Sequence, residues 1–318
     1  MKKNVILCLE FATLNTINGS MEIYKTVSDL QKELARLREQ GQKKQERKEP
    51  DRTIGFVPTM GALHEGHLAL VRRGAAENDI CVVSIFVNPT QFNDQNDLKK
   101  YPRMLERDME LLERVEGSVV LFAPIEEEIY PEPDTRLFDF GQLDKVMEGR
   151  FRPGHFNGVA QVVSRLFDIV KPDKAYFGEK DFQQLAIIRE MVRQLYIPVE
   201  IIGCPIVREK DGMALSSRNA RLSLEERKKS TIIFQTLLKS CNFAGEKSVV
   251  ELKKWVTDKI NEEPLLKVEY FDICDAETLQ GIDDWTDSQN IIGCIAVFCG
   301  EVRLIDNVWY NNRFSTTL

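Results

Sequence analysis

The sequence has no long apolar run. No uncharged apolar stretch in its 318 residues approaches the roughly 20 residues that a transmembrane helix needs. The apolar run near the amino terminus, Val5 to Leu9, is interrupted by Glu10, whereas a secretory signal peptide needs an apolar run of about 7–15 residues. The sequence therefore predicts neither a membrane span nor a signal peptide.

Paired cysteines are also missing. The seven cysteines are scattered along the chain, none of them forms a Cys-x-x-Cys pair, and several lie inside apolar runs. An odd, scattered set is typical of buried free thiols in a reducing compartment, and it disfavours a zinc site made of cysteines. The cytoplasm is the expected location.

An excess of positive charge is absent as well. The chain has 43 basic and 50 acidic residues and a formal net charge of −7, which argues against a general nucleic-acid binder. A local pocket on an acidic protein can still be basic and bind a small anion. Hydrophobic residues make up 43% of the chain, which is enough for a packed core. At about 150 residues each, the length predicts about two domains.

The first twenty residues have no clear period and are predicted to form an N-terminal extension. Ser28 to Gln31 fits a capping box that would open a helix, and Gly41 is placed to end that helix. Residues 42–52 are polar or charged apart from Pro50. This segment is interpreted as a solvated loop, with a partner-binding basic patch as the alternative.

Short apolar segments then alternate with helical patterns. The segments are apolar at nearly every position, as in strands buried on both faces of a sheet, and they are 53–57, 80–87, 119–122, 175–177 and 199–202. The helical patterns between them cover 67–76, a segment opening at Pro102, 156–170 and 181–196. This alternation predicts an α/β fold with a doubly wound parallel sheet.

After Arg208 the pattern changes. Helical patterns at 224–242 and 248–261 precede strand-like runs at 268–273, 291–298 and 302–305. They predict a smaller α+β C-terminal domain, with the boundary near Gly203–Val207. The predicted organisation is an extension at 1–20, a larger α/β domain at 21–204, and a C-terminal domain at 205–318.

The chain has only three histidines, and His64 and His67 follow the first predicted strand and open a helix. Open α/β sheets bind ligands at the carboxyl ends of their strands, and the N–H groups at a helix amino terminus bind anions. Gly61 and Gly66 would let the backbone approach a phosphate closely. The two histidines are therefore predicted to face a nucleotide phosphate chain. One alternative is a three-histidine zinc site, although zincin helices space their histidines by four residues. The other is a pair that only caps the helix.

Two further clusters carry polar side chains that suit phosphate. In Gly178–Asp181, Lys180 can contact phosphate as a point charge, and Asp181 can cap a helix or bind ribose hydroxyls. In the segment 210–219, KDGMALSSRN, two serines and an arginine can clamp a phosphate. Capping alone in the first cluster and ordinary turn chemistry in the second are the alternatives.

Three other sites carry polar residues. Gln91 follows a buried strand and is a neutral donor and acceptor, suited to alcohol or carboxylate groups. Asp97 is a candidate ligand for magnesium through oxygen or water. For both residues a solvated loop position is the alternative. Arg152 and His155 place a cation and the third histidine ahead of an apolar helix.

Eight segments occur along the chain in this order: VPTMGALHEGH, SIFVNPTQF, DLKKYPR, RPGHFNGVAQVV, FGEKDFQQLAIIREM, DGMALSSRN, DAETL and VRLIDN. Together they resemble the pantothenate synthetase (pantoate–β-alanine ligase) family of the nucleotidyltransferase superfamily, with its HxGH-type motif. The match runs from about Met21 to Asn307, some nine-tenths of the chain. Two positions depart from the family, which often has methionine where Thr90 and Leu215 stand.

The resemblance implies a Rossmann-like domain with a small C-terminal lid domain, usually as a homodimer. It implies the ATP-dependent condensation of (R)-pantoate with β-alanine to pantothenate, AMP and diphosphate, with Mg²⁺, on the route to coenzyme A. By position in the motifs, Gln91 and Gln184 would bind pantoate, and Gln91 would also lie near β-alanine. The implied catalytic residues are His67, His64, Lys180 and Arg218. The implied ATP-binding residues are Met60, Gly61, Ala62, Leu63, His64, Glu65, Gly66, His67, Gly178, Glu179, Lys180, Asp181, Val207, Leu215, Ser216, Ser217 and Arg218.

The implied reaction has two steps. The pantoate carboxylate attacks the α-phosphorus of ATP and diphosphate leaves; the amine of β-alanine then attacks the carbonyl of pantoyl adenylate and expels AMP. Two alternatives use the same histidine turn. One is another adenylyl- or cytidylyltransferase or a tRNA-charging relative, and the acidic composition disfavours tRNA. The other is a non-catalytic dimeric nucleotide sensor, which the paired glutamines and the intact Lys180 and Arg218 disfavour. Neither a nucleic acid nor a membrane is expected as a partner.

Overall fold

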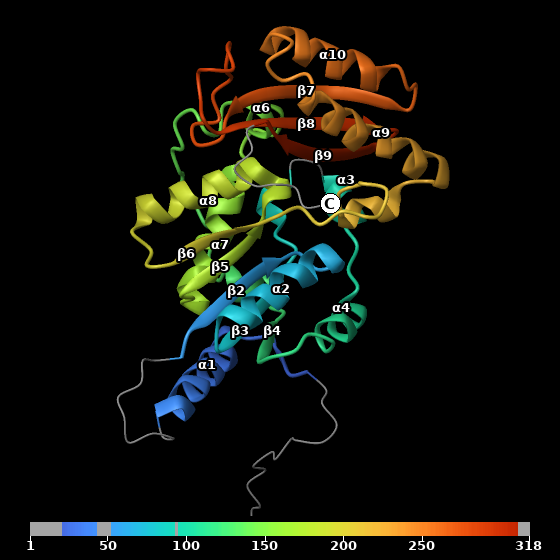
Figure 1. Cartoon of the computed structure of the whole chain (residues 1–318). Coiled ribbons are helices and arrows are strands. Elements are labelled where there is room, and N and C mark those ends of the chain that lie inside the picture. The colour runs from blue at the N-terminus through green and yellow to red at the C-terminus, as the bar shows by residue number, and fades with distance from the viewer. Residues whose placement is uncertain (1–20, 43–51, 93–94, 311–318) are drawn as a thin grey trace, which may run out of the picture.

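The computed structural model describes residues 21–42, 52–92 and 95–310. The predicted N-terminal extension and nearly all of the charged loop at 42–52 lie outside the described residues. Figure 1 shows two stacked units, a larger one around a central sheet and a smaller one, orange to red, above it. Within the described residues, no helix is both long enough and apolar enough to cross a membrane.

Six parallel strands form the sheet of the larger unit. Their order across the sheet is β1-β4-β3-β2-β5-β6. The strands are β1 (Ile23–Tyr24), β2 (Ile54–Thr59), β3 (Ile80–Ile85), β4 (Val119–Phe122), β5 (Lys174–Gly178) and β6 (Glu200–Cys204). The five predicted strands are confirmed, with ends shifted by at most two residues. The short edge strand β1 has no counterpart in the sequence prediction.

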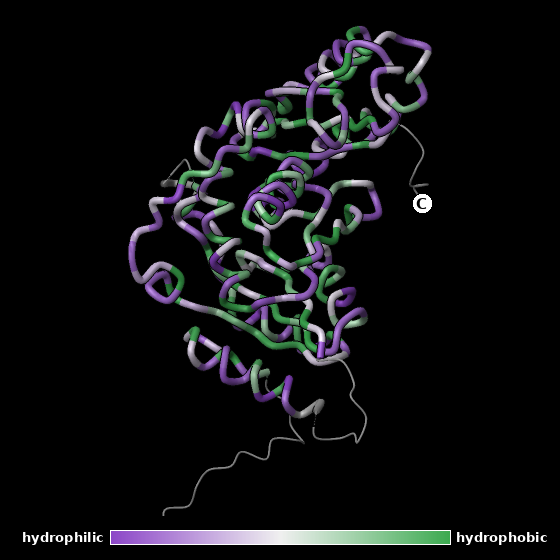
Figure 2. The backbone as a smooth tube through the Cα atoms, turned by 90° about the vertical axis from the view of Figure 1, so that its left-hand side faces the viewer, coloured by the Kyte–Doolittle hydropathy of each residue, from purple (hydrophilic) through white to green (hydrophobic). Residues whose placement is uncertain are grey.

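Helices cover both faces of this sheet, which makes it doubly wound. The helices of the larger unit are α1 (Val27–Gln42), α2 (Glu65–Glu77), α3 (Gln95–Lys100), α4 (Leu105–Leu112), α5 (Glu126–Ile129), α6 (Met147–Phe151), α7 (His155–Val170) and α8 (Phe182–Leu195). Because side chains alternate along a strand, Phe56 belongs to the core on the side of α1, α7 and α8, whereas the next residue, Val57, belongs to the core on the side of α2 and α4. In Figure 2 the tube of α1 alternates between purple and green, as expected of a helix that buries one face.

Two local predictions for helix ends are wrong. Helix α1 begins at Val27, one residue before the predicted capping box, because the Thr26 hydroxyl already accepts the Asp29 N–H at 3.1 Å, and the helix continues through Gly41. Helix α4 begins at Leu105 and not at Pro102. The preceding Tyr101 turns into the interior, where its ring packs edge-on against the Phe92 ring.

The smaller unit is an antiparallel sheet with two helices. Its strands are β7 (Leu266–Asp275), β8 (Ile291–Cys299) and β9 (Val302–Trp309), in that order across the sheet, and its helices are α9 (Leu224–Cys241) and α10 (Val249–Asn261). Both helices open with capping boxes, formed by Ser223 with Glu226 and by Ser248 with Glu251. The predicted fold class, a doubly wound parallel sheet with a smaller α+β unit, is confirmed; the domain limits stay a prediction.

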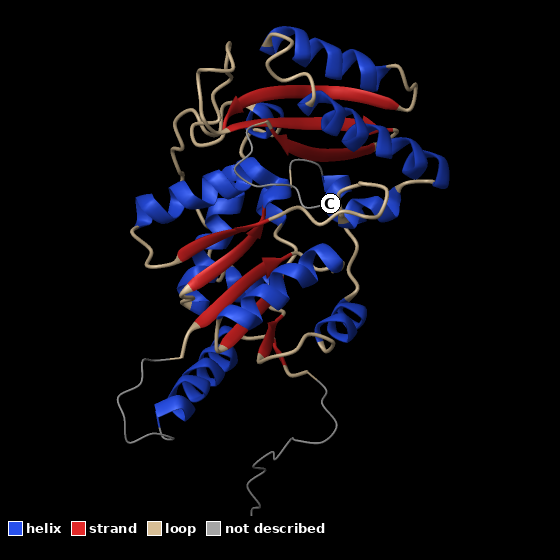
Figure 3. Ribbon diagram, in the orientation of Figure 1, coloured by secondary structure: helices blue, strands red, loops and turns tan. Residues whose placement is uncertain are grey.

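Polar contacts join the two units. Arg303 of β9 donates two hydrogen bonds to the carboxylate of Glu148 in α6, at 2.6 and 2.7 Å. Asn307 of β9 donates to the carbonyls of Glu179 and Lys180 at 2.8 and 3.2 Å. Figure 3 shows the arrowheads of the larger sheet pointing toward the smaller unit. The carboxyl ends of the parallel strands therefore face the second unit.

Candidate active site

The strand order creates a crevice between β2 and β5. Strands β3 and β4 lie on one side of β2, and β5 and β6 lie on the other, so β2 and β5 flank the topological switch point, where open α/β sheets bind ligands. The pairing of the two strands covers Gly55–Lys174 and Phe56–Ala175, and β2 then continues along β3 to Thr59. A cavity of about 220 Å³ lies where the two strands separate.

The histidine turn follows β2 directly. His64 is the N-cap residue of α2, and its Nδ1 accepts the backbone N–H of Gly66 at 3.1 Å. The rings of His64 and His67 stack with their centroids 4.0 Å apart, and both line the cavity. A Cβ atom on Gly66 would lie 2.9 Å from the His64 ring, so glycine at this position lets the ring fold over the helix start.

Both histidines are neutral at pH 7. Burial lowers the pKa of His64 to about 4 and that of His67 to about 3, and the charge of Lys180 adds to both shifts. Because Nδ1 of His64 accepts a hydrogen bond, the neutral ring carries its proton on Nε2 and can donate from there. The buried Nδ1 of His67 has no hydrogen-bond partner among the described residues. A polyanion bound beside these rings would favour their protonation.

The glycines of the turn predicted that backbone N–H groups would face a phosphate. In the structure, three of these N–H groups are instead bonded to side chains of the protein. The Gly61 N–H donates to the Thr59 hydroxyl at 3.2 Å. The next two N–H groups, of Ala62 and Leu63, donate to the carboxylate of Asp108 at 2.9 and 2.7 Å. Side chains, and not these backbone groups, are therefore the donors that the turn presents to the cavity.

Lys180 and Asp181 enter the cavity from the end of β5. They lie in a short 3₁₀ turn, Glu179–Asp181, that leads into α8. Asp181 occupies the predicted N-cap position, but its side chain does not cap the helix. Its carboxylate lies 3.5 Å from the Lys180 ammonium, and the two side chains are 49% and 19% exposed. This turn therefore presents one positive and one negative group to the cavity.

The third cluster closes the cavity from the segment before α9. The Ser216 hydroxyl accepts the Arg218 N–H at 3.2 Å and caps the 3₁₀ turn Ser217–Arg221. The Ser217 hydroxyl donates to the carbonyl of Ala62 at 3.1 Å and so joins this segment to the histidine turn. All three side chains, with Leu215 and Val207, line the same cavity.

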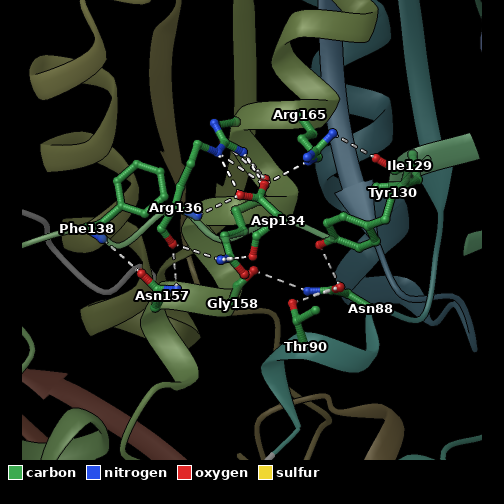
Figure 4. A network of polar contacts seen from close by, with 12 residues as sticks. Asn88, Thr90, Ile129, Tyr130, Asp134, Arg136, Phe138, Asn157, Gly158 and Arg165 are labelled. Atoms are coloured by element: carbon green, nitrogen blue, oxygen red, sulfur yellow. Dashed lines mark hydrogen bonds and ion pairs between the residues drawn. The ribbon is translucent and has the colours of Figure 1, made fainter. Parts of the chain in front are cut away.

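A buried polar network supports Gln91. Figure 4 shows Asp134 between Arg136 and Arg165, with Tyr130 and Asn88 beside them. Tyr130 donates to Asn88 Oδ1 at 2.9 Å. Asn88 Nδ2 donates at 3.2 Å both to the carbonyl of Gly158 and to Gln91 Oε1. Because a carbonyl only accepts, these bonds fix the orientation of both amides. The NH₂ group of Gln91 is then turned to the cavity, where it donates one hydrogen to the Met60 sulfur at 3.0 Å.

His155 holds the backbone of Gln91. Its Nδ1 donates to the Gln91 carbonyl at 2.8 Å, and its Nε2 accepts from the Arg152 guanidinium at 3.1 Å. Burial, with the charge of Arg152, lowers the pKa of His155 to about 4, so the ring is neutral. Both of its ring nitrogens already have protein partners, so His155 is not available as the third ligand of the zinc site considered above.

Two neighbouring glutamines on α8 have different environments. Gln184 lines the cavity. The side chain of Gln183 is 4% exposed; it donates to the carbonyls of Leu143 and Val146 and accepts the N–H of Glu148. Gln183 is therefore part of the packing of the larger unit, while Gln184 can reach a substrate.

Most predicted site residues meet at this cavity. Those that line it are Met60, His64, Gly66, His67, Gln91, Gly178, Lys180, Asp181, Gln184, Val207, Leu215, Ser216, Ser217 and Arg218. Those outside its lining are Gly61, Ala62, Leu63, Glu65 and Glu179. Leu63 is 4% exposed and packs in the core, and Glu65 points outward to pair with Arg72 at 2.9 Å. Asp97 lies in α3, and its side chain is outside the described part of the chain.

One wall of the cavity is apolar and was not among the predicted site residues. Its residues belong to α7 and line the cavity; they are Val159, Val162, Val163 and Leu166. Their spacing of i, i+3, i+4 and i+7 marks one face of a helix, but most residues of α7 are buried, so the spacing alone does not separate a face that lines a cavity from one that packs in the core. Asn88 and Tyr101 also line the cavity.

A second, larger cavity adjoins the first. Its volume is about 520 Å³, and it shares Lys180, Asp181, Ser216 and Arg218 with the first cavity. Its other walls come from both units and include Arg303 of β9. The site at the sheet is thus open toward the smaller unit, and together the two spaces are large enough for a nucleotide and a second small molecule.

The fold and this site define a class. A parallel sheet whose switch point carries two histidines, a lysine and an arginine is the arrangement of an α/β nucleotide-binding protein. Within that class, the family model described as Pantoate-beta-alanine ligase matches residues 22–309, and the chain belongs to this family. The resemblance seen in the sequence is thereby confirmed.

Known proteins are similar over nearly their whole length. The pantothenate synthetase of Phocaeicola vulgatus is 62% identical over 291 residues, which are 91% of this chain and 99% of that protein. The crystal structure of pantothenate synthetase from Thermus thermophilus is 45% identical, with a TM-score of 0.81, and the match covers 92% of this chain and all of that one. The Francisella tularensis pantoate-beta-alanine ligase, solved with "Beta-gamma ATP and Beta-alanine", is 35% identical, with a TM-score of 0.74 and coverages of 91% and 98%.

Proposed function

We propose that the cavity between β2 and β5 is where this chain joins pantoate to β-alanine with the cleavage of ATP. The chain is an ATP-dependent pantoate–β-alanine ligase by family and by full-length similarity to pantothenate synthetases. One observation supports this location of the reaction: five side chains line a single cavity at the switch point, namely those of His64, His67, Gln91, Lys180 and Arg218. These residues come from four separate parts of the sequence.

Pantoate occupies the inner part of the cavity in this proposal. Its dimethyl carbon suits the apolar face of α7, and its hydroxyl and carboxylate oxygens suit the amides of Gln91 and Gln184. The NH₂ group of Gln91, one hydrogen of which contacts the Met60 sulfur, donates its other hydrogen to these oxygens. Two neutral amides hold the carboxylate without neutralising it, so it keeps its nucleophilicity.

ATP lies across the histidine turn and the end of β5. The pantoate carboxylate attacks the α-phosphorus, the bond to the bridging oxygen breaks, and diphosphate leaves. Negative charge grows on the phosphoryl and diphosphate oxygens, where Nε2–H of His64, the His67 ring, the Lys180 ammonium and the Arg218 guanidinium stabilise it. Positioned donors of this kind supply most of the catalysis in phosphoryl transfer.

In the second step, the amine of β-alanine attacks the carbonyl carbon of pantoyl adenylate. The carbon–oxygen bond to the phosphate breaks, AMP leaves, and the amine loses a proton to give the amide. The chain needs no nucleophile of its own for either step. Since water would hydrolyse the adenylate, the wall that the smaller unit forms around the adjoining cavity helps to exclude it.

Magnesium fits this site as a metal that arrives with ATP. Asp181 places one carboxylate beside the phosphate-binding lysine. Mg²⁺ commonly takes one or two carboxylates and completes its shell with phosphates and water. The described residues contain no cluster of three or more ligating side chains, so Asp181 and ATP would hold the ion. When bound, it would neutralise charge on the phosphate oxygens. The sequence-based candidate, Asp97, stays a prediction.

We also infer a homodimer in the cytoplasm. The six described cysteines are free thiols, which suits a reducing compartment. Exposed apolar side chains occur on two adjacent segments: Leu137 is 88% and Tyr196 91% exposed, and Gln194 hydrogen-bonds the carbonyl of Asp139 between them. The homodimer itself is what the family resemblance implies, and these exposed side chains are candidates for its contact. Light scattering that gave the mass of a single chain would contradict the dimer.

The experiment for the function is AMP release from ATP with each substrate omitted in turn. The proposal predicts AMP and pantothenate in equal amounts only when pantoate and β-alanine are both present. A nucleotide sensor would bind ATP and release no substrate-dependent AMP. Release of ADP and phosphate in place of AMP and diphosphate would contradict the proposed bond cleavage.

A further inference from the structure

Asp108 is a buried carboxylate far in sequence from the histidine turn, yet in contact with it. It lies in α4 and is 1% exposed. Its Oδ2 accepts the N–H of Ala62 at 2.9 Å, and its Oδ1 accepts the N–H of Leu63 at 2.7 Å. Both oxygens therefore serve two consecutive N–H groups of the segment that immediately precedes His64. Hydrogen bonds to an ionised acceptor are about twice as strong as those between neutral groups.

The segment that these bonds hold is strained. Gly61 and Ala62 both have positive φ angles, of 79° and 49°. For alanine, the left-handed region is unfavourable because Cβ comes too close to the following carbonyl oxygen, so the surroundings must impose this conformation. A Cβ on Gly61 would lie 3.1 Å from Asp108 Oδ2, which shows how closely the carboxylate fits the turn.

The same segment sets the direction of the histidines. His64 caps α2 two residues after Ala62, and its ring stacks on His67. The Ala62 carbonyl accepts the Ser217 hydroxyl at 3.1 Å. A change in the Ala62 peptide would therefore move both the histidine ring that faces the cavity and the serine segment that closes it.

We propose that Asp108 is a positioning residue: by holding the N–H groups of Ala62 and Leu63, it keeps the histidine turn in the conformation that directs His64 and His67 into the cavity. Its carboxylate takes the place that a bound anion has at other glycine-rich turns. The consequence for catalysis rests on the proposed function, whereas the consequence for the histidine rings does not.

The test compares Asp108→Asn with a matched control, Asp173→Asn. Asp173 also accepts a backbone N–H, that of Ile54 at 2.6 Å, but at the opposite end of β2. Asp108→Asn preserves the volume of the side chain but removes one of its two acceptors. The new NH₂ group would face the N–H of Ala62 or Leu63, and two donors cannot form a hydrogen bond. The chain has three histidines, so a ¹H–¹⁵N spectrum of the imidazole rings has three sets of signals, and His155 serves as an internal reference.

In Asp108→Asn, the signals of His64 and His67 are expected to move while those of His155 stay. kcat is expected to fall by about 10- to 100-fold, as for a misplacement of about 1 Å, with a smaller change in the KM for pantoate. Asp173→Asn should leave all three histidine signals and kcat unchanged. If Asp108→Asn only lowers the melting temperature, with unchanged histidine signals and kcat, the carboxylate has a packing role alone and the proposal is wrong.

A measurement on the unaltered chain covers the case in which the variant does not fold. The amide hydrogens of Ala62 and Leu63 should exchange slowly with solvent, although they lie in a loop. Exchange as fast as in an unprotected loop would overturn the proposal. If the unaltered protein makes no AMP, but the histidine signals still shift in Asp108→Asn, the proposed function is contradicted and the positioning role of Asp108 is supported.

Discussion

Replacing Lys180 by alanine removes one positive charge from the cavity and little else. The ammonium lies 3.5 Å from the Asp181 carboxylate, whose side chain is 49% exposed. The Lys180 side chain is only 19% exposed, but solvent around the half-exposed Asp181 screens the pair, so its contribution to stability is about 1 kcal/mol. In a unit the size of the larger one, losing about 1 kcal/mol of stability shifts the melting temperature by no more than about 4 °C. The fold should therefore survive.

The effect on the reaction should be far larger. Lys180 is directed at oxygens whose charge grows in the transition state, and interactions of that kind appear in kcat. Loss of one such donor typically lowers the rate by about 10²–10³, which corresponds to roughly 2.7–4 kcal/mol. A second consequence is independent of turnover. Because the Lys180 charge lowers the pKa values of His64 and His67, both pKa values should rise in the variant.

The assay is steady-state AMP formation at saturating substrates, with a melting curve and an NMR titration of the histidines. Lys174→Ala is the matched control, because Lys174 lies at the other end of β5, where it pairs with Glu77 at 3.8 Å. The control should keep its kcat and its histidine pKa values. A folded Lys180→Ala protein that retained more than about a tenth of the original kcat would refute the catalytic role, given the expected loss.

Three further predictions concern binding, protonation and reaction order. Gln184→Ala and Gln91→Ala should each weaken pantoate binding by roughly 1–3 kcal/mol, with little change in ATP binding. Gln183→Ala should lower the melting temperature instead, because Gln183 is bonded within the larger unit. Equal losses of ATP and pantoate binding in calorimetry would contradict the assignment of Gln91 and Gln184. His155 has a pKa lowered from 6.5 to about 4, so it stabilises the fold above its ordinary pKa and this stabilisation is lost as pH falls. Urea curves give the unfolding free energies of the unaltered chain and of His155→Gln. The difference between them should narrow as the pH falls from about 7 to about 5, by up to about 1.4 kcal/mol per pH unit. A constant difference would argue against a neutral His155 ring. ATP and pantoate alone should exchange labelled diphosphate into ATP, and an exchange that strictly required β-alanine would count against a separate first step.

Much of the fold follows from short-range pattern. Strands such as β3 are apolar at nearly every position because they are covered on both faces, and the alternation with helices requires parallel pairing. The order of the strands does not follow from the same pattern, because the choice between the two sides of β2 depends on contacts across the whole sheet. Helix ends also depend on single side chains: the Thr26 hydroxyl accepts the Asp29 N–H, and α1 begins directly after Thr26.

The candidate site divides in a similar way. Side chains that follow strand ends, such as His64 and Lys180, could be predicted because the carboxyl ends of parallel strands meet. Asp108 could not be predicted, because an aspartate within an amphipathic helix gives no sign of a partner 46 residues away. The difference between Gln183 and Gln184 depends on which face of α8 is turned to the cavity, and the family resemblance, not the spacing, selected Gln184.

The fate of the carboxylate oxygens of pantoate tests the account most directly. If the carboxylate attacks the α-phosphorus of ATP and the amine of β-alanine then displaces AMP, one carboxylate oxygen leaves with AMP. Pantoate labelled with ¹⁸O in its carboxylate should therefore give AMP that carries one ¹⁸O atom, as measured by mass spectrometry. Unlabelled AMP, formed at the same rate as pantothenate, would contradict the acyl-adenylate route and the roles given to the residues around this cavity.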